Sequence, residues 1–261
     1  MEKRDAKVSS RIWVATTYLT LGSGTGTGAV VSKPQADRYL DRAAEVYGKL
    51  LEAGDDPDVA RFEPSIRLKL AAIHRDRGRW DEARRQVDWI LADAARQNSL
   101  DAQEAAAGIL QAQAAALAAT DAAAAEAAYE EAASGRAGGP IWGWGGIAAK
   151  VGRQAFSGHD AKAIRGRELF FTARLNQATC LVARGRLPGV AAEQASDLLA
   201  KAATAVTVTR KLYPDLGGPA LAARYEALLK DIQRQQGATD PRGFAELDEQ
   251  SRTTPAAAVA N

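Results

Sequence analysis

Residues 66–91 constrain the fold most strongly, because apolar side chains recur there at helical spacing on both sides of one glycine. The apolar positions are Leu68, Ala71, Ala72, Ala83, Val87, Ile90 and Leu91. Gly78 interrupts the spacing once, and glycine readily adopts the positive φ that ends a helix. Asp81 and Glu82 follow, where carboxylates favour a helix N-terminus. The stretch therefore predicts two short helices joined by a tight turn.

This helix pair resembles a tetratricopeptide repeat. The matching residues are Leu70 and Ala71 in the first helix, Gly78 at the turn, and Ala83, Val87 and Ile90 in the second helix. The stretch departs from the family pattern at Arg67, at His74, where the family usually has an aromatic residue, and at Ala95. The resemblance implies stacked helix pairs whose first helices line a surface that holds a protein segment.

Weaker copies of the same spacing recur along the chain, as in Ala43, Tyr47 and Leu50. We expect helix pairs at about 8–53, 64–97, 100–133 and 167–212, a Gly- and Trp-rich connector at 134–166, a capping helix at 219–236 and a polar tail at 237–261. In this scheme Pro64 precedes a helix, one helix continues to Arg96, another covers 147–156, and another begins at Arg167. The predicted fold is an all-α, right-handed α-solenoid of about four tetratricopeptide-like pairs with expanded turns.

Composition excludes several classes of protein. The 34 Lys and Arg nearly balance the 32 Asp and Glu, so no nucleic-acid partner is expected. No stretch has the ~18 apolar residues of a membrane span, and no signal peptide is recognisable. The default expectation is a cytoplasmic protein, or an extracellular one if a leader has been removed or the chain builds an extracellular filament.

Groups suited to catalysis are scarce, and we expect no enzyme, cofactor or metal ion. The chain has only two histidines: His74 lies within a predicted helix, and His159 has one neighbouring carboxylate, Asp160, which is too few ligands for a metal. Cys180 lies among apolar helical residues, which favours a buried thiol over a nucleophile. Residues 22–28, GSGTGTG, lack the preceding strand and following Lys-Ser or Lys-Thr of a phosphate loop.

Two features leave structural and functional interpretations open. The sequence RGR occurs at 77–79, 165–167 and 184–186, where arginines can cap helix ends or form a basic ridge that meets an acidic partner. In residues 134–146, Trp142 and Trp144 can fill a gap between helix pairs, or they can form an exposed aromatic platform.

The leading functional hypothesis is a non-enzymatic scaffold for a protein partner or for further copies of the same chain. The candidate partner-binding residues are Arg67, His74, Arg75, Trp142, Trp144, Arg174 and Gln177. A second hypothesis is a structural subunit that assembles into a homo-oligomer, filament or tube through its unlike ends. A third is a regulatory or docking segment of a larger enzyme.

Overall fold

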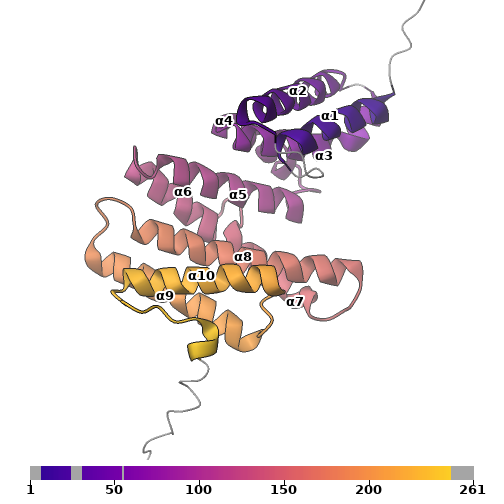
Figure 1. Ribbon diagram of the computed structural model, residues 1–261. Helices are drawn as coiled ribbons and strands as arrows, with labels where there is room; N and C mark the ends of the chain where they lie inside the picture. Colours follow the sequence, from indigo (N-terminus) through magenta and orange to yellow (C-terminus); the bar gives the residue numbers. More distant parts are fainter. Residues whose placement is uncertain (1–6, 25–30, 55, 248–261) are drawn as a thin grey trace, which may run out of the picture. The chain divides into compact units, whose positions relative to one another are not determined.

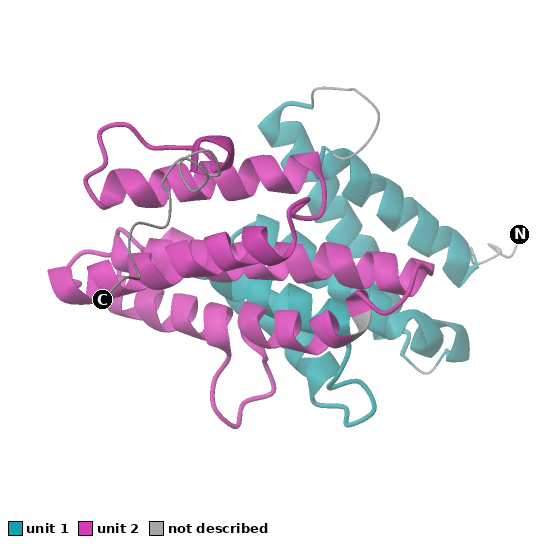
Figure 2. Cartoon of the chain, turned by 90° about the horizontal axis from the view of Figure 1, so that it is seen from below, with its two compact units in different colours: residues 1–113 teal, residues 114–261 magenta. Residues whose placement is uncertain are grey.

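The computed structural model describes residues 7–24, 31–54 and 56–247, which form helices and turns without a β-strand among them (Figure 1). The all-α prediction is therefore confirmed for these residues. The chain divides into unit 1, residues 1–113, and unit 2, residues 114–261 (Figure 2). The greater part of residues 22–28 lies outside the described residues, as does the end of the predicted tail.

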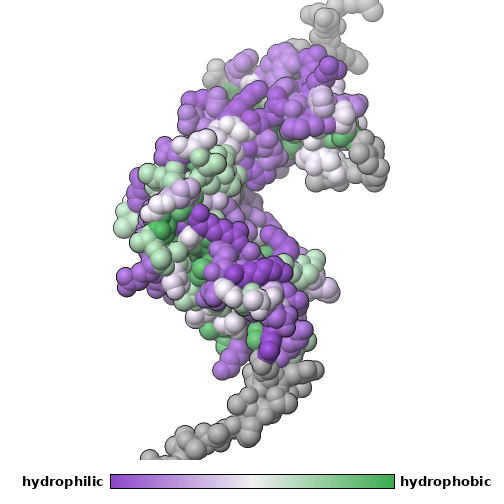
Figure 3. Space-filling model, turned by 60° about the vertical axis from the view of Figure 1, so that its left-hand side comes forward, coloured by the Kyte–Doolittle hydropathy of each residue, from purple (hydrophilic) through white to green (hydrophobic). Residues whose placement is uncertain are grey.

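Unit 1 contains α1 (Val8–Gly22), α2 (Lys33–Glu52), α3 (Pro57–Asp76), α4 (Trp80–Leu91) and most of α5 (Leu100–Leu117). Helix α1 packs on α2, α3 packs on α4, and α3 also contacts both α1 and α2. The predicted apolar stripe of α2 is buried at Leu40, Ala43, Tyr47 and Leu50. On the face of unit 1 that Figure 3 draws, most of the side chains are hydrophilic.

Helix α3 begins at Pro57 and not after Pro64, so the predicted start was wrong. The Asp56 side chain accepts a hydrogen bond from Asp58 N, and Pro57 occupies the first turn, where its missing N–H costs nothing. Val59 is buried in the core of unit 1. Capping and burial together retain Pro64 inside the helix, although its ring removes one backbone hydrogen bond.

Helix α4 ends at Leu91, five residues earlier than expected. The Asp93 carboxylate accepts a hydrogen bond from Ala95 N at 2.9 Å, which favours a turn over continued helix. At the other end of α4, Gly78 has a φ of 68°, as the sequence predicts for this turn.

Unit 2 contains α6 (Ala122–Ser134), α7 (Gly143–Ala155), α8 (Ala161–Gly185), α9 (Ala192–Leu212) and α10 (Pro219–Gln235). Helix α8 contacts each of the other four. Tyr225 of α10 is fully buried, and its hydroxyl donates to Phe171 O of α8 at 2.7 Å. Phe244, in the predicted tail, is also buried in this core.

The predicted connector at 134–166 contains all of α7 and the first turns of α8. Helix α7 begins four residues earlier than expected, and α8 begins six residues before Arg167. The carboxylate of Asp160 caps α8 by accepting from Ala163 N at 2.7 Å. A Cβ at Gly166 would contact Ala155 at 3.5 Å, so the glycine lies at a close approach of α7 and α8. Because α8 starts at the Asp160 cap, Gly166 lies within a helix and not in a loop.

Candidate functional site

Arg67 links α3 to an exposed tryptophan of α4. Its guanidinium lies 4.0 Å from the centre of the Trp89 ring, and Arg96 lies over the same ring at 5.7 Å. Arg67 also donates to Glu63 at 2.7 Å and to Gln86 at 3.0 Å, so its orientation is fixed. Trp89 remains 37% exposed. We call Arg67, Trp89 and Arg96 the Trp89 platform.

The other two candidates on α3 have different environments. Burial lowers the pKa of His74, and the charge of Arg79 lowers it further. Its Nδ1 is buried and has no hydrogen-bond partner among the residues that the structure describes. Arg75 donates to the adjacent Asp76 at 2.7 Å. None of these contacts connects His74 or Arg75 to the Trp89 platform.

The two tryptophans of the connector differ in burial. Trp144 is buried within α7, with 3% of its surface exposed, which excludes it from an exposed platform. Trp142 is partly exposed, and the ammonium of Lys150 lies 4.9 Å from its ring centre. Trp144 is therefore a packing residue of unit 2, while Trp142 stays partly exposed.

Arg174 and Gln177 form one polar cluster with Thr209 in unit 2. Arg174 donates to Gln177 Oε1 and to Thr209 Oγ1, both at 3.3 Å. A Cβ at Gly145 would lie 2.5 Å from Gln177 Nε2, so α7 passes close to this cluster. The hydrogen bonds join α8 to α9, which gives these two candidates a structural role inside unit 2.

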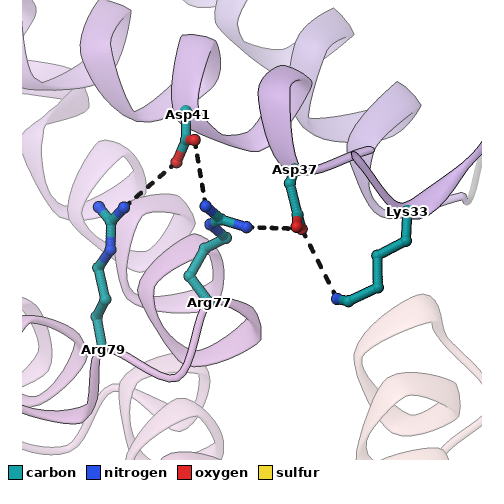
Figure 4. Close-up of polar contacts among 5 residues, drawn as sticks. All are labelled: Lys33, Asp37, Asp41, Arg77 and Arg79. Atoms are coloured by element: carbon teal, nitrogen blue, oxygen red, sulfur yellow. Dashed lines mark hydrogen bonds and ion pairs between the residues drawn. The ribbon is translucent and has the colours of Figure 1, made fainter. Parts of the chain in front are cut away.

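The first RGR sequence connects α2 to the turn between α3 and α4 (Figure 4). Arg77 pairs with Asp37 at 2.7 Å and with Asp41 at 3.2 Å, and Arg79 pairs with Asp41 at 3.4 Å. These contacts raise the pKa of Arg77, with the hydrogen bond to Asp37 as the largest cause. We call Asp37, Asp41, Arg77 and Arg79 the Arg77 network.

The remaining RGR arginines also have partners within unit 2. Arg167 donates to Ala155 O and Gly158 O, Arg184 pairs with Glu126 and Glu130, and Arg186 pairs with Asp231. Together with the Arg77 network, these contacts favour the structural interpretation of the RGR arginines over a free basic ridge. Sequence alone did not show the carboxylates and backbone carbonyls that these arginines contact.

Lys69 is a residue that the sequence analysis missed. Its Nζ donates to Thr16 Oγ1 at 2.9 Å and lies 5.8 Å from the centre of the Tyr47 ring. Burial lowers its pKa. The only available sequence signal was a lysine two residues from the predicted site residue Arg67, within a helix whose apolar face was already assigned.

The described residues contain no cluster of three or more His, Cys, Asp or Glu side chains able to hold a metal ion. Burial raises the pKa of the Cys180 thiol to about 12, so this thiol stays protonated at neutral pH. None of the helices described is long and apolar enough to cross a membrane.

Comparisons with protein-family models, with curated proteins and with solved structures find no match to this chain.

Proposed function

We propose that this chain is a non-enzymatic helical-repeat scaffold that binds a protein partner. One observation carries the proposal: some helices contact both the next helix in the sequence and the helix after it. In unit 1 this occurs between α1 and α3, and in unit 2 between α6 and α8 and between α8 and α10. Contacts of this kind are typical of helix pairs that stack as tetratricopeptide-like repeats, because each pair buries its apolar face only against the next.

The Trp89 platform is the surface of unit 1 best suited to a partner. Tryptophan and arginine are enriched among residues that dominate binding energy, and here two guanidinium groups hold one indole in place. Because Arg67 is already fixed by Glu63 and Gln86, binding at the platform costs little additional side-chain entropy.

Affinity capture from the source cells with wild-type protein, Trp89→Ala and Arg85→Ala tests this proposal. Arg85 is the matched control, since it is also on α4, is 69% exposed and forms only a 3.9 Å pair with Glu82. Trp89→Ala should reduce recovery of the partner by about tenfold or more, while Arg85→Ala should not. Helicity measured by circular dichroism should be equal in all three. Equal recovery with all three proteins would contradict the proposal.

A second candidate function, assembly of copies of the chain, is supported by α1. Trp13 is 69% exposed and Val14 is 38% exposed. They lie with Ser10 and Thr17 on one exposed stripe, which contains no charge within α1 and follows the exposed Lys7. Stripes without charge are suited to contact with another copy, since no like charges meet.

Sedimentation velocity over a hundredfold range of concentration tests assembly. We expect oligomers of the wild-type protein at high concentration, their loss in Trp13→Glu and their retention in Trp89→Glu. A wild-type monomer throughout that range would rule this candidate out.

A further inference from the structure

Lys69 carries a positive charge that lies where α1, α2 and α3 meet and that has no carboxylate partner among the described residues. Its contacts there are the hydroxyl of Thr16 and the ring of Tyr47. The other cations nearby on α3 are paired, Arg67 with Glu63 and Arg75 with Asp76. Lys69 therefore differs from these two arginines in having a hydroxyl and an aromatic ring as its contacts instead of a carboxylate.

The hydrogen bonds around Thr16 show which donors of Lys69 remain available. The Thr16 hydroxyl donates to Ile12 O at 2.8 Å, so its oxygen accepts from Lys69 and from the Tyr47 hydroxyl, which lies 2.8 Å away. An ammonium group has three N–H donors, and Thr16 accepts one of them. Two N–H donors of Lys69 therefore have no acceptor in the described part of the chain.

The electrostatic environment favours an added negative charge. Burial lowers the pKa of Lys69, and no carboxylate of the described residues raises it again. Helix α1, which supplies Thr16, contains no acidic residue. The Lys69 residue remains partly exposed. A carboxylate placed there would offset the cost of burying the ammonium.

The geometry points to Lys69 as the recognition group of a carboxylate-binding site, with Thr16 and Tyr47 as its positioning residues. The occupant is the side chain of Asp or Glu in an acidic segment of the protein partner, and this part of the inference rests on the proposed scaffold function. A carboxylate carries one negative charge and two acceptor oxygens, which suit the single positive charge and the two remaining N–H donors of Lys69. Phosphate is a poorer match, because the hydroxyl hydrogens of Thr16 and Tyr47 are both in use.

Nuclear magnetic resonance of the full chain with labelled lysine side chains tests this site without knowledge of the partner. Lys69→Met identifies the Lys69 signal by its loss. The probes are a hexaglutamate peptide, a hexaglutamine peptide and inorganic phosphate, all at one ionic strength. We expect a saturable shift of the Lys69 signal with hexaglutamate alone, together with a rise in the pKa of the Lys69 amine.

Variants distinguish binding of the peptide at Lys69 from non-specific attraction between the acidic peptide and other lysines. Lys69→Met should weaken hexaglutamate binding at least about tenfold, and Lys69→Arg should retain saturable binding. Lys49→Met is the control, because Lys49 is 59% exposed on α2 and already paired with Glu45. An equal loss in Lys49→Met, or no saturable shift of the Lys69 signal, would overturn the site. A shift with phosphate alone would overturn the carboxylate assignment. Partner capture through Trp89 is measured separately, so failure of one proposal does not imply failure of the other.

Discussion

Lys69 and Arg77 lie eight residues apart, one within α3 and one at its end, yet their side chains contact different groups. Arg77, which caps the end of α3, reaches two carboxylates of α2, whereas Lys69 reaches two hydroxyl-bearing residues of α1 and α2. A cation whose charge is balanced inside the fold stabilises the packing of helices. One whose charge is left unbalanced adds little stability and remains available for a ligand.

The largest effect is expected from Arg77→Met, which leaves Asp37 and Asp41 without their shared cation. Because Arg77 is 22% and Asp41 46% exposed, solvent reduces the effect, and we expect a loss of about 1–2 kcal/mol in the free energy of unfolding. Urea denaturation measures it. Arg85→Met, at an exposed and distant pair, should change stability by less than about 0.5 kcal/mol. If both variants were equally stable, the Arg77 network would have no structural role.

Thr16→Val should have the next largest effect, because it removes the acceptor shared by Lys69 and Tyr47. We expect a loss of about 1 kcal/mol, measured in the same way. Thr17→Val is the control, since the exposed Thr17 hydroxyl donates only to Trp13 O in its own helix. The hydroxyl of Thr16 would be shown not to position Lys69 if the two variants behaved alike.

Lys69→Met should have a smaller effect of the opposite sign from Arg77→Met. Removing a partly buried cation without a carboxylate partner eliminates its desolvation cost, so stability should stay unchanged or rise by about 0.5 kcal/mol. Destabilisation as large as that of Arg77→Met would show that Lys69 is a structural residue, and the contrast between the two cations would fail.

The smallest effect concerns pH. Burial lowers the pKa of Lys69 in the folded protein below its ordinary value of 10.5. Between the folded pKa and 10.5, Lys69 is therefore protonated in the unfolded chain and has released its proton in the folded chain. The free energy of unfolding of the wild-type protein should therefore rise relative to Lys69→Met as pH increases toward 10.5. Burial raises the pKa of Tyr47, which has the opposite effect above its ordinary value of 10.0 in both proteins, so the difference reports Lys69. A difference that does not change with pH would contradict this assignment.

Sequence reasoning located the helices well where burial follows one clear stripe. Leu40, Ala43, Tyr47 and Leu50 share a face of α2 and are buried together, as predicted. It failed where tertiary packing overrides local propensity. Pro64 lies inside α3, where the Asp56 cap and the burial of Val59 offset its local cost. Gly166 lies inside α8, which starts earlier than expected at the Asp160 cap.

The candidate site was predicted less well, for a different physical reason. Arg67 was identified, and it does contact an exposed aromatic side chain, but Trp89 itself was not chosen. Whether a charge is free depends on its neighbours in space. Arg77 and Arg184 looked available in the sequence and are paired in the structure, whereas Lys69 looked ordinary and has no carboxylate partner among the described residues.

The free energy of unfolding with and without hexaglutamate distinguishes a structural Arg77 from an available Lys69. At a peptide concentration one hundred times the Kd, the wild-type protein should gain about 2.7 kcal/mol. Arg77→Met should start from lower stability and show the same gain, while Lys69→Met should start near wild-type stability and gain at most about 1.4 kcal/mol, because its binding is at least about tenfold weaker. Equal gains in the two variants, or a loss of the gain in Arg77→Met alone, would contradict the account.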